Sequence, residues 1–275
     1  MVDQPPPGQR YSHLYVRTDK LLPDSKRMRI RVGGLCKPTI DGRTWEAVAA
    51  FLSRELGVYV DHYLPTFFED AEIRDFLDGL TLIYKLLETR DPNGAKLWFL
   101  EVTRILKEES AGYRIDEKAG LHPLVDFEFE TLRVATIQVL AGQRYKATLA
   151  TFEGAHEALE RDPPDTKEAV RDVFGAVENL FKLMTAGQAS RLVKFEIEKH
   201  VPPMLDQKYK DVTARTAAGK MVESLIGWVA AGHCYRHEPG TPEPAPPPMD
   251  YAIMTMGTGA GFLRWLAEID RALNP

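Results

Sequence analysis

The sequence predicts an all-α fold, a multi-helix bundle with a small β-hairpin near residues 113–125. Three observations predict this class. Long segments carry apolar residues three and four positions apart, which is the period of a helix with one buried face. Breaks rich in proline and glycine separate these segments. The 275 residues are enough to bury a core, either as one large helical domain or as two smaller ones.

We expect three parts along the chain. Residues 1–43 are rich in proline, glycine and charge, and they predict an N-terminal irregular or partly ordered segment. Residues 44–112 predict an N-terminal helical part. Residues 113–275 predict the hairpin followed by a helical bundle, which is either separate from residues 44–112 or continuous with them.

The N-terminal helical part begins at Thr44, which can cap a helix with an apolar stripe that extends to Leu56. A second helix is expected from about residue 69 to residue 89, before Asp-Pro-Asn-Gly at 91–94 turns the chain. A third helix is indicated by a further apolar stripe: Leu97, Leu100, Val102, Ile105 and Leu106.

The hairpin is predicted because two short segments flank Ala119-Gly120, which places a glycine at the turn. Asp126 can then cap a helix. Residues 127–160 predict either a helical hairpin or a bent helix around Gly142 and Gly154.

The clearest helix follows the break at residues 161–165, where Asp165 or Thr166 supplies the N-cap. Its broad apolar stripe predicts a core helix: Val170, Val173, Phe174, Val177, Leu180, Phe181 and Met184. A C-cap is expected at Ala186-Gly187-Gln188.

The last third of the chain predicts one short helix and two longer ones. The short helix spans residues 191–199, because Pro202-Pro203 is expected to end it. The longer helices span about 211–233 and from near Pro248 onward, joined by a proline-rich connector. The Gly-Thr-Gly-Ala-Gly sequence at 257–261 lies within the last helix, so close helix packing explains it better than phosphate binding.

A resemblance to a bacterial defence family emerges in residues 113–184. Tyr113-Arg114-Ile115, Leu124-Val125-Asp126, Asp162-Pro163-Pro164 and the segment 170–178 follow the order seen in the helical domain of AbiJ-type abortive-infection proteins. Because the shared positions are mostly core and capping residues, the resemblance implies a scaffold and a biological context rather than a reaction.

The C-terminal part, from Trp228 to Trp265, resembles HEPN-like helical bundles. Ribonucleases of that superfamily use an Arg followed a few residues later by a His, and the sequence contains no pair with the required spacing. The two resemblances together imply a noncatalytic helical binding or regulatory module in bacterial phage defence, in an abortive-infection or toxin–antitoxin setting. The alternative is a divergent HEPN-like ribonuclease or another phosphoester-directed enzyme.

The candidate catalytic residues for this alternative are His233, Arg236 and His237. If the helix continues through them, the two histidines share one face and become weak candidates for metal ligands, with Arg236 positioned to hold a phosphate. Basic side chains near a helix C-terminus also complement the helix dipole. We favour this structural role, and we predict neither a metal nor a cofactor.

The candidate nucleic-acid-binding residues are Lys26, Arg27, Arg29 and Arg31. Their alternating spacing predicts one basic face on a strand or a broken stripe on a helix. No aromatic residues are interleaved with them to stack on bases. A solvated face that offsets the acidic excess of the chain is the favoured interpretation.

Charge and cysteine content narrow the cellular compartment and the kinds of partner that we expect. The net charge of −5 gives no overall attraction to nucleic acid. Cys36 and Cys234 form no CxxC pair and are interpreted as ordinary thiols of a reducing compartment. The first residues lack the features of a signal peptide, and no apolar run is long enough for a membrane span. We therefore expect a cytoplasmic protein that contacts a partner protein or itself, with RNA as a further candidate partner and no membrane contact.

Overall fold

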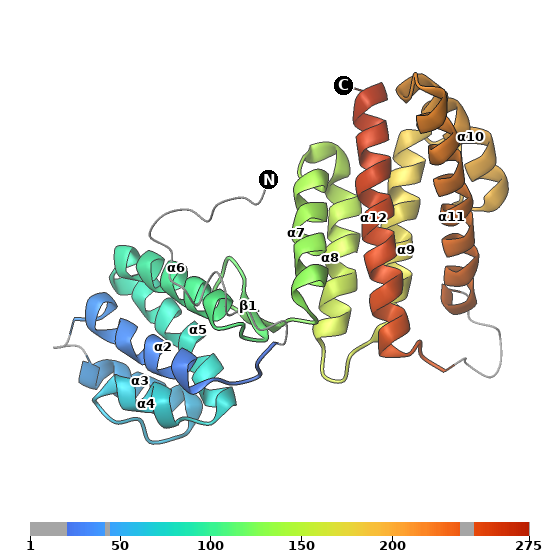
Figure 1. Ribbon diagram of the computed structural model, residues 1–275. Coiled ribbons are helices and arrows are strands. Elements are labelled where there is room, and N and C mark those ends of the chain that lie inside the picture. The colour runs from blue at the N-terminus through green and yellow to red at the C-terminus, as the bar shows by residue number, and fades with distance from the viewer. Residues whose placement is uncertain (1–20, 42–44, 237–244, 275) are drawn as a thin grey trace, which may run out of the picture. The chain divides into compact units, whose positions relative to one another are not determined.

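The computed structural model describes residues 21–41, 45–236 and 245–274, with the backbone alone for Arg236 (Figure 1). Within this part of the chain all regular structure is helical except for one two-stranded hairpin, so the predicted fold class is confirmed. The chain divides into two compact units, Met1–Asp126 and Phe127–Pro275, called here the N-terminal and C-terminal units. Of the helices in the described segments, none has both the length and the apolar character needed to cross a bilayer.

The N-terminal unit packs its helices around one aromatic core. Its elements are α2 (Lys26–Thr39), α3 (Trp45–Leu56), α4 (Leu64–Asp70), α5 (Ile73–Arg90), α6 (Pro92–Glu108), β1 (Tyr113–Ile115) and β2 (Leu121–Pro123). Trp98 of α6 is fully buried against Phe68 of α4, with ring centroids 5.9 Å apart. Phe68 also meets Phe76 of α5 edge to face, so the aromatic rings connect three helices.

Helix α2 lies within the segment that we expected to be irregular or partly ordered. Ser25 caps it by accepting a hydrogen bond from the Met28 amide. Met28, Val32 and Cys36, each four residues after the last, form its buried stripe. This stripe is hard to recognise in the sequence, because arginines at 27, 29 and 31 alternate with apolar residues. Alternation of this kind is as typical of a strand as of a helix.

The hairpin forms as predicted but packs with the N-terminal unit, so the boundary between the units follows residue 126 instead of residue 112. Its turn also differs in detail from the expected one. Ala119, not Gly120, adopts the left-handed conformation, with φ of 61°. Gly120 is needed for space, because a Cβ there would lie 2.8 Å from a carboxylate oxygen of Asp116.

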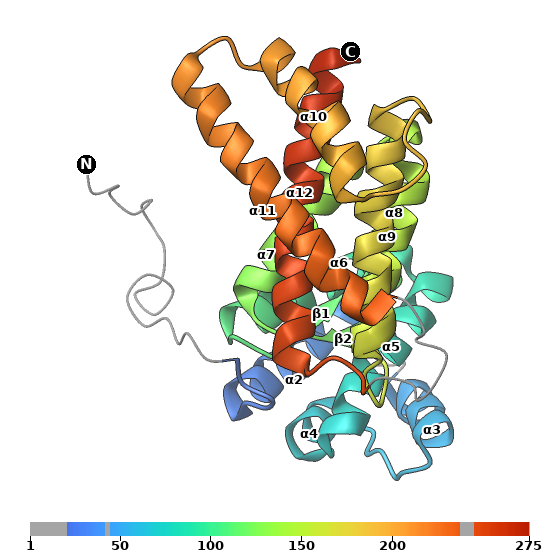
Figure 2. The ribbon, with the colours of Figure 1, turned by 90° about the vertical axis from the view of Figure 1, so that its right-hand side faces the viewer.

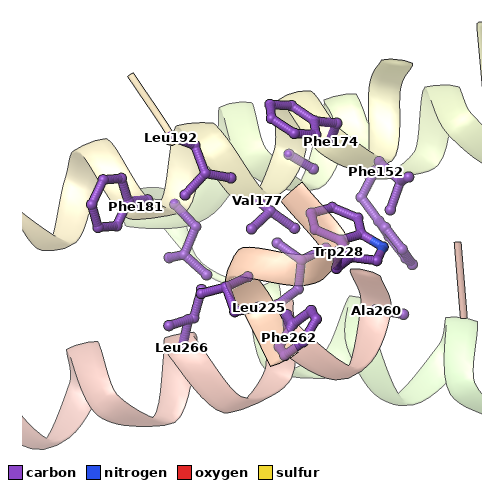
Figure 3. Close-up of a cluster of buried hydrophobic side chains, with 14 of the residues drawn as sticks. Phe152, Phe174, Val177, Phe181, Leu192, Leu225, Trp228, Ala260, Phe262 and Leu266 are labelled. Carbon is purple, nitrogen blue, oxygen red and sulfur yellow. The ribbon is translucent and has the colours of Figure 1, made fainter. Parts of the chain in front are cut away.

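The C-terminal unit is a bundle with α9 at its centre. Its elements are α7 (Phe127–Leu140), the short 3₁₀ helix η2 (Gln143–Tyr145), α8 (Lys146–Glu160), α9 (Thr166–Met184), α10 (Lys194–Lys208), α11 (Val212–Arg236) and α12 (Met249–Leu273). Helix α9 packs against α8, α11 and α12, and α11 runs obliquely beside them (Figure 2). Figure 3 shows Phe174, Val177 and Phe181 of α9 in the core that these helices share.

Several predicted boundaries in this unit are confirmed. Asp165 is the N-cap of α9 and accepts a hydrogen bond from the Glu168 amide at 2.8 Å. Gly142, with φ of 141°, separates α7 from α8, whereas Gly154 lies inside α8. The helix end expected at residues 186–188 also forms: Ala186, with φ of 49°, is the left-handed residue after the C-cap Thr185, and the Gly187 amide donates to the Lys182 carbonyl at 2.9 Å.

The expected end of a helix at Pro202-Pro203 is wrong. Helix α10 continues through both prolines to Lys208. Both prolines are exposed, whereas Val201 and Leu205 are buried. Burial of these two residues on the opposite face therefore offsets the lost backbone hydrogen bonds, which is a tertiary contribution that local propensity does not include.

The glycine-rich segment of α12 is a close-packing site, as we predicted. A Cβ at Gly259 would lie 2.6 Å from Cγ2 of Val173 and 2.9 Å from Cζ2 of Trp228. Gly261, two residues along the same helix, has no heavy atom within 4 Å of that position. Gly259 therefore brings α12 close to α9 and α11.

These two glycines allow a matched test. Gly259→Ala is expected to destabilise the protein, because overpacking costs about 1–3 kcal/mol and exceeds a helix-propensity gain of at most about 1 kcal/mol. Gly261→Ala is expected to stabilise it by about 0.5–1 kcal/mol. Urea denaturation of both variants measures the difference. A stabilising effect of Gly259→Ala would contradict close packing at this position.

Candidate functional site

Of the candidate catalytic cluster that we expected at the end of α11, only His233 has a described side chain. The imidazole of His233 packs against Phe174 of α9, with ring centroids 5.3 Å apart. Gly232 permits this approach, since a Cβ there would lie 2.9 Å from the Phe174 ring. The side chain of Arg236 and all of His237 lie outside the described residues. The contact between His233 and Phe174 is one of packing, and convergence of the three side chains stays a prediction.

The prediction that the chain holds no metal remains open for the same reason. Among the described residues, no group of three or more His, Cys, Asp or Glu side chains is arranged to hold a metal ion. The weak ligand pair His233 and His237 includes one residue outside that description. Cys36 is buried, and burial raises the pKa of its thiol to about 12, which keeps it protonated and unreactive.

Two of the candidate nucleic-acid-binding residues, Arg29 and Arg31, are engaged inside the N-terminal unit. Arg29 is buried and donates two hydrogen bonds, of 2.7 and 2.8 Å, to the carboxylate of Asp24. It also donates to the Ala71 carbonyl at 2.6 Å, which ties α2 to the end of α4. Hydrogen bonds from Arg29 hold the pKa of Asp24 below its ordinary value.

Arg31, two residues further along α2, serves a similar structural purpose. It pairs with Glu108, and it donates to Glu109 at 2.7 Å, which joins α2 to the end of α6. Arg27 lies 3.5 Å from Glu109 but is 72% exposed, and Lys26 is also exposed. The basic segment is therefore mainly a set of internal ion pairs, with Lys26 and Arg27 on the surface.

A polar hollow of about 420 Å³ lies at the start of α9, lined by Asp165, Lys167, Glu168, Arg171 and Asp172. Burial raises the pKa of Asp172, and the neighbouring carboxylates of Glu168 and Asp165 raise it further, against the opposing effect of Arg161. Glu168 pairs with Arg161, and Asp165 caps the helix. Helix capping and ion pairing therefore account for Asp165 and Glu168.

A second pocket, called here the Arg144 pocket, has a volume of about 570 Å³. Its lining residues come from η2, α8, α9, the turn after α9 and the end of α12: Arg144, Ala147, Thr148, Asn179, Lys182, Leu183, Met184, Ala186, Gly187 and Asn274. Arg144 donates through Nε and Nη2 to the two carboxylate oxygens of Asp270, at 2.7 and 2.9 Å. This pair connects η2 to α12 across the end of the bundle.

Asp270 is the buried centre of this network. Its side chain is fully buried, and it also accepts hydrogen bonds from the Tyr145 hydroxyl at 2.7 Å and the Asn274 amide at 3.0 Å. Burial by itself raises the pKa of Asp270, but the hydrogen bonds from Arg144 and Tyr145 outweigh it and hold the pKa below its ordinary value. The hydrogen bond to Asp270 likewise raises the pKa of Arg144. Both groups are charged at neutral pH.

The Arg144 pocket was not predicted from the sequence, because its residues are far apart along the chain. One signal was present. Asp270 follows Leu263 and Leu266 at helical spacing on the apolar face of the last helix. A single carboxylate on such a face needs a buried cation or donor as its partner, although the sequence does not identify Arg144 as that partner.

An exposed aromatic loop occupies residues 57–63 of the N-terminal unit, called here the Tyr59 loop. Tyr59 is 87% exposed, although the next residue, Val60, is buried in the core. The Val60 amide donates to the Ser53 hydroxyl at 3.0 Å, and the Tyr63 amide donates to Asp61 at 2.7 Å. Val60 therefore holds the backbone directly after Tyr59, whose own side chain stays on the surface.

The Tyr59 loop ends at a second exposed aromatic residue, Tyr63. Tyr63 is 45% exposed and packs on Trp45 of α3, with ring centroids 5.6 Å apart. Val58, before Tyr59, is also exposed. The loop thus presents apolar and aromatic groups together, a composition typical of protein-binding surfaces.

Comparisons of this chain with protein-family models, with curated proteins and with solved structures found no match.

Proposed function

We propose that this chain is a noncatalytic helical binding or regulatory module of bacterial phage defence, in an abortive-infection or toxin–antitoxin setting. It acts by contacting a partner protein through the Tyr59 loop. The resemblance of residues 113–184 to AbiJ-type proteins supports the biological setting. The observation that carries the binding role is the 87% exposure of Tyr59 on an anchored loop.

The anchoring of the loop supports this role energetically. Binding costs free energy when a flexible segment must become ordered, and a loop that is already held in place avoids much of that cost. Val60 in the core and the hydrogen bond to Ser53 hold the loop before any partner arrives. Tyrosine is also among the residues that contribute most strongly at protein interfaces.

The arrangement of the basic helix α2 favours a protein partner over RNA. Arg29 and Arg31 each form ion pairs with carboxylates of the same unit. A phosphate backbone would have to compete with these intramolecular partners, which reduces the electrostatic attraction on which nucleic-acid binding depends.

The proposal predicts that Tyr59→Ala abolishes phage protection. Loss of a central tyrosine costs an interface about 2 kcal/mol or more, which weakens affinity by about thirtyfold. The measurement is plaquing efficiency on a bacterial host that expresses wild type or variant at equal levels. Leu100→Ala is the matched control, because Leu100 is an exposed apolar residue of α6 in the same unit. Equal protection by wild type and Tyr59→Ala would refute the role of the loop.

A second experiment tests the noncatalytic part of the proposal. Purified wild type is incubated with RNA, with and without divalent metal, beside Arg236→Ala and His237→Ala. Intact RNA under all conditions is the expected result. Cleavage by the wild type that both variants lose would replace the proposal with the ribonuclease alternative.

A further inference from the structure

The Arg144 pocket has a charge pattern that the proposed partner contact does not use. Two cations, Arg144 and Lys182, line it, and its lining includes no carboxylate. Their counter-ions, Asp270 and Glu178, are buried and face other groups as well. Asp270 accepts from Tyr145, and Glu178 accepts from the Leu192 amide at 3.0 Å.

The geometry of the Arg144 pair leaves part of its guanidinium available to a ligand. A guanidinium is a planar fork with donors on more than one edge. The edge formed by Nε and Nη2 is used for Asp270. Nη1 therefore lies on a different edge from the carboxylate. Lys182 is held less tightly, with Nζ 3.6 Å from Glu178, and its side chain is 39% exposed.

A buried hydroxyl group provides a second, independent observation. Thr148 lines the pocket and is 0% exposed, and its Oγ1 has no hydrogen-bond partner among the described residues. A buried hydroxyl without a partner is costly, so its presence calls for an explanation. Thr148 belongs to the first turn of α8, whose N-cap residue, Tyr145, supplies no side-chain hydrogen bond. The positive end of a helix dipole favours an anion there.

A purely structural role accounts for only part of this arrangement. Arg144 donates to the Leu183 carbonyl at 3.3 Å, and Lys182 lies in the last turn of α9. Both cations therefore complement the negative end of that helix. This role does not explain the unpartnered hydroxyl of Thr148 beside the two cations in one pocket.

The lining indicates the chemistry of the ligand. Two cations and the amide groups of Asn179 and Asn274 suit the several acceptor oxygens of a phosphate. Leu183 and Met184 form an apolar part of the lining next to them. We propose that the Arg144 pocket binds a phosphate monoester that carries a small apolar group. This site is independent of the partner contact at the Tyr59 loop.

The proposal is tested by isothermal titration of the purified full chain with phenyl phosphate and with inorganic phosphate. Phenyl phosphate is expected to bind, and inorganic phosphate more weakly, because it lacks the apolar group. Lys182→Met, which keeps the aliphatic stem, is expected to weaken binding about tenfold. Lys220→Met makes the same charge change at an exposed position of α11 and is the matched control, with affinity unchanged.

The hydroxyl of Thr148 is tested separately by the nearly isosteric Thr148→Val. This variant is expected to keep or raise the unfolding temperature, because it removes an unpartnered buried hydroxyl. It is also expected to weaken phenyl phosphate binding. Unchanged affinity in Thr148→Val would assign the hydroxyl no part in the site.

Three other results would overturn the proposal wholly or in part. If the folded protein shows no saturable binding of phenyl phosphate up to about 10 mM, the proposed site is excluded. Equal affinity in wild type and Lys182→Met would place any binding elsewhere. The third result is that wild type binds phenyl phosphate and inorganic phosphate equally well and Lys182→Met binds neither. It would support a phosphate site but contradict recognition of the apolar group. None of these outcomes depends on phage protection, so they are separate from the test of Tyr59.

Discussion

Trp98→Ala is expected to lower the free energy of unfolding of the N-terminal unit by about 3–5 kcal/mol, the usual cost of truncating a fully buried aromatic side chain. Trp98 is 0% exposed, and its indole nitrogen donates to the Leu80 carbonyl at 3.1 Å. Its ring packs against Phe68, so the variant leaves a cavity where α4, α5 and α6 meet. The cavity cannot close fully, because helices packed on several sides relax only in part.

The measurement is urea denaturation combined with hydrogen exchange of peptides from α5 and α6. Protection in those peptides is expected to fall with the loss of stability. Leu100→Ala on the same helix is the control, because an exposed leucine contributes about 0.5 kcal/mol or less. A loss below about 1 kcal/mol for Trp98→Ala would contradict the central place of Trp98 in this core.

Asp270→Asn is expected to destabilise the C-terminal unit by about 2–3 kcal/mol, since it removes charge-assisted hydrogen bonds from a buried site. The carboxylate accepts from Arg144, Tyr145 and Asn274. An asparagine keeps one acceptor oxygen, and its NH₂ group opposes the donors that face it. Because Arg144 is partly exposed and can rehydrate, the cost stays below that of isolating a fully buried charge.

The loss of stability in Asp270→Asn is expected to depend on pH. The pKa of Asp270 is held below its ordinary value in the folded state. Its stabilising contribution is therefore complete above the unfolded pKa of about 3.9 and disappears as the pH falls through the lower, folded pKa. The stability difference between wild type and Asp270→Asn is expected to be constant near neutral pH and to shrink on acidification. A difference that grows in acid would contradict the depressed pKa.

The order of helices could be predicted from the sequence where apolar residues recur at helical spacing. Helix α9 illustrates this, since its stripe and its cap at Asp165 are both local patterns. Helix α2 was missed because charged residues interrupt its buried stripe. Helix α10 was expected to end at its prolines, although burial of Val201 and Leu205 carries it to Lys208.

The candidate sites could be predicted only in part. Two charged side chains were interpreted as candidates for RNA binding. Arg29 pairs with Asp24 nearby but also donates to the Ala71 carbonyl, 42 residues away, and the carboxylate partners of Arg31 are 77 and 78 residues away. Arg144, which lines the Arg144 pocket, pairs with Asp270, 126 residues away in sequence. No local pattern encodes such a distance.

The sequence by itself determined the all-α class, the hairpin, most helix boundaries and the packing role of the glycine-rich segment 257–261, because these depend on period, capping and residue size along one segment. The tertiary structure alone decided three things: that α2 belongs to the core, that Arg29 and Arg31 bind groups of α4 and α6, and that Arg144, Lys182 and Thr148 share one pocket. The physical reason is the same in each case. Burial and charge pairing depend on which distant segments meet in the folded chain.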